Sequence, residues 1–219
     1  MMAEKFLRLN CTEILKFIEI NIETIPAKWN PLGFIVFQLG IDTSGNSLRL
    51  HVWPKNNRKI STHAPGIHCH AWYLTSLMLK GGYVDKHYNA IEYGYLEEKE
   101  RIEKNLLRKF ILNYHENGTT SLINRGECVD IVLRDVIIAR KGTIQNIKDS
   151  IFHAPDVPLD QDVVTLVIDS AQLGYPTTAL LNCDQDFPTN SRKLVTQHER
   201  NSVRILLNEI LKDEDAKSI

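Results

Sequence analysis

The sequence lacks long apolar runs and an excess of charge of either sign. No stretch reaches the roughly 18 apolar residues that a membrane-spanning helix needs, and the charged N-terminal segment lacks the apolar core of a secretory signal. The 26 basic and 27 acidic residues give a net charge of -1, whereas a nucleic-acid binder usually carries a basic patch or stripe. We therefore expect no contact with membranes or nucleic acids.

Cysteine is also scarce. The four cysteines stand at positions 11, 69, 128 and 183. None of them forms a C-x-x-C pair, and their wide spacing indicates no disulfide framework. Reduced thiols are the simplest account of them, and this favours a cytoplasmic location.

The rest of the composition is that of an ordinary globular protein. The chain has 219 residues, of which 43% are hydrophobic and 24% charged. A chain of this length can bury a substantial core without disulfide or metal staples. Long linkers and low-complexity segments are absent from the sequence, so a single domain over residues 1–219 is expected.

Short β-like runs dominate the middle of the chain. Over about 33–185 they alternate with turns rich in Gly, Asp and Asn, which predicts a mainly β sandwich or barrel. At the two ends, apolar residues recur at i, i+3 and i+4 and predict helices over about 11–22 and 190–212. Thr189 or Asn190 can cap the second helix. We expect both helices to pack outside the barrel, or to pair the subunits of a homodimer.

A histidine-rich segment is the densest group of polar residues that can carry chemistry. Three of the eight histidines lie within residues 63–70. In an extended strand, residues i and i+2 point to one side, so His68 and His70 present two imidazoles to one face. Cys69 then faces the other way as a small buried apolar residue. Neutral imidazole binds iron, zinc, copper or nickel; the alternative is a chance His-x-His pair in a surface strand.

A third metal ligand must come from elsewhere in the chain, and His153 is the candidate. It follows a glycine-led strand over residues 142–147 and a short turn, and a barrel can bring such a residue opposite the first pair. A lone loop histidine is the competing interpretation. For His63 the alternatives are a partner of a ligand, a spare ligand or a loop histidine.

The two histidine regions resemble the metal-binding motifs of a known family. Gly66-Ile-His-Cys-His70, with a strand that ends at Leu79-Lys-Gly81, looks like the first cupin motif, and residues 141–153 look like the second. The resemblance covers about residues 33–170. It implies a double-stranded β-helix, which is the RmlC-like jelly-roll barrel. It also implies a divalent metal held by both histidines of the first motif and by His153.

The sequence departs from the cupin pattern at one position. Many cupins carry a glutamate ligand five residues after the second histidine, and that position here is Thr75. The resemblance therefore implies an all-histidine triad of His68, His70 and His153.

One branch of the family has a similar layout. Residues 48–53, a polar turn and the His-Cys-His sequence follow one another as in cysteine dioxygenase and related thiol dioxygenases. However, Thr75 also replaces the cysteine that cross-links to tyrosine in some of those enzymes. The strand over residues 163–168 lacks the late histidine and tyrosine expected of them. Cysteine itself is therefore not the expected substrate.

Further residues are candidates for the pocket. Arg49, His51 and Trp53 alternate and so share one strand face. If that face is inward, Arg49 can bind a substrate carboxylate through its planar fork, Trp53 lines the pocket and His51 is an acid–base candidate. The opposite phase, residues 48, 50 and 52, is the more typical inward set, whereas the family resemblance favours the polar one. Thr75 either contacts substrate or belongs to the core.

The proposed triad narrows the chemistry. Three neutral histidines leave the charge of the ion uncompensated, which favours an anionic ligand, and three protein ligands leave open positions. We expect a metal-dependent cupin enzyme, a non-haem iron dioxygenase acting on a small polar or anionic substrate, a class that includes thiols. Fe(II) is the expected cofactor, with Zn, Ni and Mn as alternatives. The competing hypothesis is a non-catalytic cupin that binds a metal or a small ligand and has a regulatory or interaction role.

Overall fold

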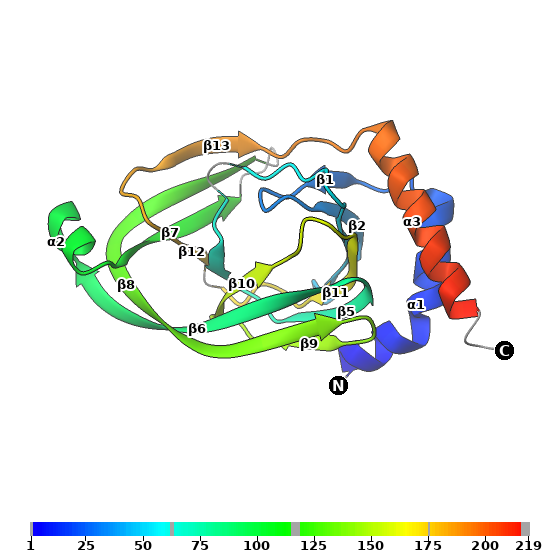
Figure 1. Cartoon of the computed structure of the whole chain (residues 1–219), viewed down its shortest axis with the longest axis horizontal. Helices are drawn as coiled ribbons and strands as arrows, with labels where there is room; N and C mark the ends of the chain where they lie inside the picture. Colours follow the sequence, from blue (N-terminus) through cyan, green and yellow to red (C-terminus); the bar gives the residue numbers. More distant parts are fainter. Residues whose placement is uncertain (1, 62–63, 115–118, 175, 216–219) are drawn as a thin grey trace.

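The strands form two antiparallel sheets that are flanked by helices from both ends of the chain (Figure 1). The computed structural model describes residues 2–61, 64–114, 119–174 and 176–215. One sheet has six strands in the order β1-β2-β3-β11-β5-β9. The other has seven in the order β13-β8-β6-β10-β4-β12-β7, and β8 also pairs with β7. The expected mainly β architecture with terminal helices is confirmed.

The elements have the following bounds in chain order. The helices are α1 (Met2–Asn21), α2 (Glu98–Glu103) and α3 (Gln197–Asp215). The strands of the six-stranded sheet are β1 (Ala27–Trp29), β2 (Ile35–Ile41), β3 (Ser47–Trp53), β5 (Leu74–Lys80), β9 (Ile144–Ile147) and β11 (Val163–Asp169). The strands of the other sheet are β4 (Ile67–Cys69), β6 (Gly82–Tyr95), β7 (Leu107–Tyr114), β8 (Thr119–Arg140), β10 (Phe152–Asp156), β12 (Thr177–Leu181) and β13 (Phe187–Ser191).

The expected helix boundaries are wrong at both ends. Helix α1 begins at Met2 rather than near residue 11. At the other end, β13 occupies the residues that were expected to cap and start the last helix, and α3 begins only at Gln197. The N-terminus of α3 is a capping box: the Glu199 carboxylate accepts from the amide of Thr196 at 2.8 Å, and the Thr196 hydroxyl accepts from the amide of Glu199 at 3.3 Å. The sequence Thr-x-x-Glu therefore marks the true start.

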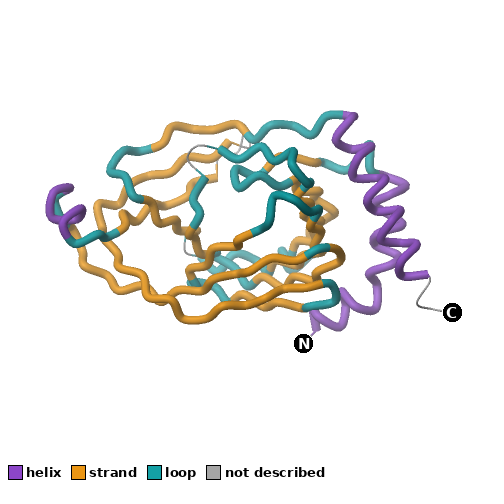
Figure 2. The backbone as a smooth tube through the Cα atoms, viewed as in Figure 1, coloured by secondary structure: helices purple, strands orange, loops and turns teal. Residues whose placement is uncertain are grey.

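The largest hydrophobic core lies between the six-stranded sheet and the two terminal helices, which pack side by side (Figure 2). Leu15 of α1 and Leu207 of α3 are fully buried, as are Leu50 and Leu166 of the sheet. Because the helices cover the outer face of this sheet, its apolar side chains point outward to them. The polar phase of β3 is left to face the space between the two sheets.

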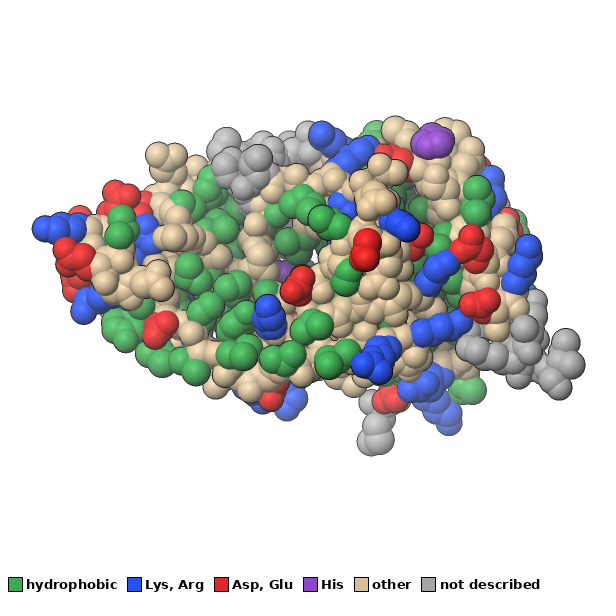
Figure 3. All heavy atoms as spheres, viewed as in Figure 1, with side chains coloured by type: hydrophobic (Ala, Val, Ile, Leu, Met, Phe, Trp, Pro, Cys, Tyr) green, Lys and Arg blue, Asp and Glu red, His purple; other side chains and the backbone are tan. Residues whose placement is uncertain are grey.

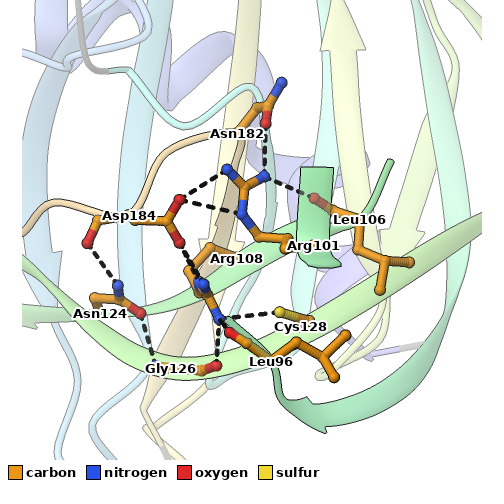
Figure 4. A network of polar contacts seen from close by, with 9 residues as sticks. All are labelled: Leu96, Arg101, Leu106, Arg108, Asn124, Gly126, Cys128, Asn182 and Asp184. Carbon is orange, nitrogen blue, oxygen red and sulfur yellow. Dashed lines mark hydrogen bonds and ion pairs between the residues drawn. The ribbon is translucent and has the colours of Figure 1, made fainter. Parts of the chain in front are cut away.

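The strands β6 and β8 continue beyond the space between the sheets and carry α2 at their far end (Figure 1). Asp184, in the loop after β12, holds this extension by a hydrogen bond from Arg101 at 2.8 Å and one from Arg108 at 2.6 Å (Figure 4). Arg101 and Arg108 are almost fully buried. Burial raises the pKa of Asp184, but the hydrogen bonds from the two arginines outweigh it and hold the pKa below its usual value.

Hydrophobic side chains gather along the lower edge of the molecule in the space-filling view (Figure 3). Strand β8 contributes Leu133, Val136 and Ile138, each more than half exposed. Apolar atoms contribute a large part of the surface of most folded proteins.

Candidate metal centre

The three histidines of the expected triad come together between the sheets. His68 lies on β4 and His153 on β10, and the two are direct partners in the antiparallel ladder. His70 follows directly after β4. The ring centroids of His68 and His70 lie 4.9 Å apart, and those of His68 and His153 lie 4.5 Å apart. One nitrogen of each ring lies within 4.8 Å of the others.

The geometry and charge of these rings fit a metal ion. Nε2 of His70 lies 3.1 Å from Nε2 of His153. Two nitrogens that bind one ion at about 2.1 Å are separated by roughly 3 to 3.4 Å, so the pair already has the required spacing. Burial, together with neighbouring histidines, lowers the pKa of His68 to about 3 and holds the pKa of His70 well below its usual value. Both are therefore neutral, which is the form that binds metals.

A buried carboxylate stands behind the triad. Asp85 of β6 is fully buried, and its Oδ1 accepts from Nδ1 of His153 at 3.1 Å. Its Oδ2 lies 3.1 Å from Nε2 of His87. Burial raises the pKa of Asp85, but hydrogen bonds from the two histidines outweigh it and hold the pKa below its usual value. Such a carboxylate fixes the proton on Nδ1 and leaves Nε2 free to bind a metal.

Two further side chains complete this polar network. The amide of Gln145 on β9 donates to Asp85, and its oxygen accepts from the Tyr83 hydroxyl at 2.8 Å. Asp85 would thus partly balance the charge of a bound ion, although it contacts the ligand His153 and not the ion itself. This corrects the expectation that the charge of the ion is fully uncompensated. Asp85, His87 and His153 also form a second set of metal-capable side chains. The hydrogen bond from His153 to Asp85 favours the set with His68 and His70.

Asp85 was not among the residues expected from the sequence, although its position in the chain carries a signal. Tyr83, Asp85 and His87 occupy every second position of β6, and all three are buried. Polar residues at a period of two within a long strand indicate a polar interior face.

A cavity of about 430 Å³ lies between the two sheets and is lined by all three triad histidines. Arg49, His51 and Trp53 line it as well, so the polar phase of β3 faces inward, against the more typical pattern. The reason is that α1 and α3 bury the opposite phase from outside.

Each of these three residues has a defined role in the wall of the cavity. Nη1 of Arg49 forms an ion pair with Asp169 of β11 at 2.9 Å. Trp53 packs against Phe34 with ring centroids 4.5 Å apart. Burial, followed by the charges of Arg49 and Arg192, lowers the pKa of His51 to about 3. A group with this pKa is a hydrogen-bonding imidazole at neutral pH and a poor general base.

Thr75 does not contribute to this cavity, which corrects its expected contact with substrate. It lines an outer hollow with Met2 and Phe6, and its hydroxyl donates to Asn146 at 2.9 Å. The cause is the alternation of β5, which turns Ser76 rather than Thr75 toward the cavity.

Cys69 faces away from the triad, as expected, and packs with Val129, Phe152 and Leu180. All four cysteines are free thiols. His63 lies outside the described residues. Among the described helices, none is long and apolar enough to cross a bilayer. The single domain, the cytoplasmic location and the homodimer stay predictions.

The strands and helices define a class of fold, two antiparallel β-sheets with a helix at each end of the chain. No protein-family model and no curated protein matches the chain. It is similar to the solved structure of an RmlC-like cupin from Shewanella frigidimarina, with 10% identity, a TM-score of 0.34 and coverage of 68% of this chain and 85% of that one. A cupin-like protein from Thermotoga maritima shares 16% identity, with a TM-score of 0.35 and coverage of 81% and 92%.

Hydroxypropylphosphonic acid epoxidase from S. wedmorenis is similar at 8% identity, with a TM-score of 0.38 and coverage of 68% of this chain and 56% of that one. At such identities these likenesses concern the fold alone.

Proposed function

We propose that this chain is a metal-dependent enzyme, a non-haem iron dioxygenase that acts on a small anionic molecule. One observation carries the proposal: Nε2 of His153 meets Nε2 of His70 at 3.1 Å, while Nδ1 of His153 is held by Asp85. This arrangement directs a lone pair of His153 at the space shared with His70 and His68.

Each buried residue has a part in this proposal. Iron(II), when bound, supplies the chemistry of dioxygen. The three histidines would bind the ion through neutral nitrogen atoms. Asp85 would orient His153 and place one negative charge behind this ligand. A doubly charged ion with a single carboxylate behind it leaves a net positive centre. This centre favours an anionic substrate.

The cavity walls favour the same class of molecule. Arg49 and Arg192 line the cavity and bring positive charge, and Asp169 offsets part of it. Trp53 and Trp72 contribute apolar surface to the lining, which excludes water and strengthens electrostatic contacts. A volume of about 430 Å³ is in the range of small-ligand sites.

A second candidate function is a non-catalytic cupin that binds a metal or a small ligand. It is favoured by the ion pair that already engages Arg49 and by the low pKa of His51. The cavity wall that carries Arg49 and His51 can therefore bind a ligand, but it offers no strong base for catalysis.

Metal analysis of protein purified without chelators tests the proposal. We expect stoichiometric iron, measured together with zinc, nickel and manganese. The metal should disappear in His68→Ala and His153→Ala but remain in His198→Ala, a matched change at an exposed position. Oxygen uptake with a panel of small acids and thiols then separates the enzyme from the binding protein. Metal-free wild-type protein with an intact fold would contradict the metal centre.

A further inference from the structure

The six-stranded sheet forms the cavity wall that faces the histidines, and this wall carries buried polar atoms without partners. His51 and Thr165 are cross-strand neighbours on β3 and β11, and they are 9% and 1% exposed. Nε2 of His51 and Oγ1 of Thr165 have no hydrogen-bond partner among the described residues. Buried polar groups are normally hydrogen-bonded. These two atoms are therefore suited to contact a bound molecule.

Asp169 adds a directed acceptor to the same wall. The residue is 2% exposed, and its Oδ2 accepts from the Ser47 hydroxyl at 3.3 Å and from Arg49 at 2.9 Å. Its Oδ1 accepts no hydrogen bond from any residue that the structure describes. Burial raises the pKa of Asp169, while the charge of Arg49 and the donors of Ser47 and Trp72 oppose this rise only in part. Nε1 of Trp72 and Oδ1 of Asp169 nevertheless form no hydrogen bond of good geometry with a described residue.

Trp72 connects this polar wall to the metal centre. Its ring stacks on His70 with centroids 5.1 Å apart, and the Arg49 guanidinium lies 5.9 Å from its centroid. One aromatic ring therefore separates a triad histidine from the ion pair of Arg49 and Asp169. A small molecule in the cavity can therefore lie close to both.

We propose that the cavity binds a small 2-hydroxycarboxylate, with its hydroxyl donating to Oδ1 of Asp169 and its carboxylate near Arg49. Thr165 and His51 bind the same polar end of the molecule. Asp169 already forms an ion pair with Arg49, so a neutral hydroxyl suits its Oδ1 better than an ammonium group, which would add a second positive charge beside Arg49. The inference rests on the proposed function, because it takes the histidines as the reacting end of the cavity.

Ligand titrations followed by NMR test the inference on metal-free protein and on zinc-loaded protein. The probes are lactate, pyruvate, propanoate and alanine, which differ in the group on one carbon. Wild-type protein should bind lactate about tenfold or more tightly than pyruvate or propanoate, since the hydrogen bond involves a charged acceptor. In Asp169→Asn the amide oxygen can stay toward Arg49, which places the amide NH₂ at the position of Oδ1. The preference should then reverse in favour of pyruvate.

Thr165→Val provides a second variant of nearly unchanged shape and should weaken lactate binding several-fold. Thr75→Val is its matched control, because Thr75 lies outside the cavity, and it should bind lactate like the wild type. Equal binding of lactate and propanoate, tighter binding of alanine, or no binding of any probe would overturn the inference. So would a lactate preference confined to zinc-loaded protein and unchanged by Asp169→Asn, because it would come from the metal. The metal-free titration stands even if the metal centre fails.

Discussion

Asp85 accepts a hydrogen bond from Nδ1 of His153 at 3.1 Å, and this contact fixes which ring nitrogen of His153 faces the other two histidines. The two residues lie on neighbouring strands, β6 and β10. The register pairs His153 with His87, and Asp85 lies two residues away on the same face of β6. The orientation of the histidine is thus set by strand pairing together with a buried charge.

Replacement of Asp85 should weaken metal binding without removing a ligand. In Asp85→Asn the anionic acceptor is lost, and we expect a 10- to 100-fold loss of metal affinity. Competition with a chelator of known affinity measures it. The exposed Asp156 offers a matched control, and Asp156→Asn should retain wild-type affinity. Equal affinities of Asp85→Asn and wild type would show that the carboxylate does not support the metal.

Asp184 should make stability depend on acid. Its folded-state pKa is lowered, so its contribution is present above the unfolded pKa of about 3.9 and is lost as pH falls through the folded value. Asp184→Asn should lower the free energy of unfolding at pH 7 by about 2 kcal/mol, since two buried arginines lose a charged acceptor. Urea titrations at pH 7 and pH 3 should show the gap to wild type narrowing at low pH. A gap that is constant with pH would refute this.

The core beneath the terminal helices should determine the stability of the fold without affecting metal binding. Leu207→Ala removes a fully buried side chain of α3 and should cost about 2 to 5 kcal/mol. Ile205 of the same helix is 63% exposed, and Ile205→Ala should change stability by less than about 0.5 kcal/mol. Urea unfolding measures both, with metal content determined in parallel. Loss of metal from folded Leu207→Ala would contradict the separation of core and site.

The capping box of α3 should contribute measurably. Thr196→Ala removes the hydroxyl that accepts from the Glu199 amide and should cost about 1 kcal/mol, whereas Thr196→Gly should cost only a few tenths. Thermal unfolding of the two variants side by side gives the comparison. An alanine variant as stable as wild type would show that the helix starts without this cap.

The sequence predicted much of this arrangement, and its failures have physical causes. His68 and His70 could be predicted because side chains of a strand repeat every two residues. His153 could be predicted from its place after a glycine-led strand and from the family resemblance. Asp85 could not be predicted in the same way, because its role depends on which strand pairs with β10. Thr75 was expected in the pocket because it occupies the position five residues after the second histidine of the motif, but the alternation of β5 turns it outward. The start of α3 was misplaced because Thr189 and Asn190 resemble a cap, while both belong to β13, in which Asn190 pairs with Thr120 of β8.

Strands β3 and β11 serve the core with one set of residues and the cavity with the other. On β3 the even positions Leu50 and Val52 belong to the core under the helices, and the odd positions Arg49 and His51 line the cavity. In a saturation mutagenesis scan of these strands, substitutions at even-numbered and odd-numbered positions should therefore have different effects. Changes at even positions should alter expression and melting temperature, and changes at odd positions should alter ligand preference. Binding specificity can accordingly diversify along these strands while the scaffold keeps its stability.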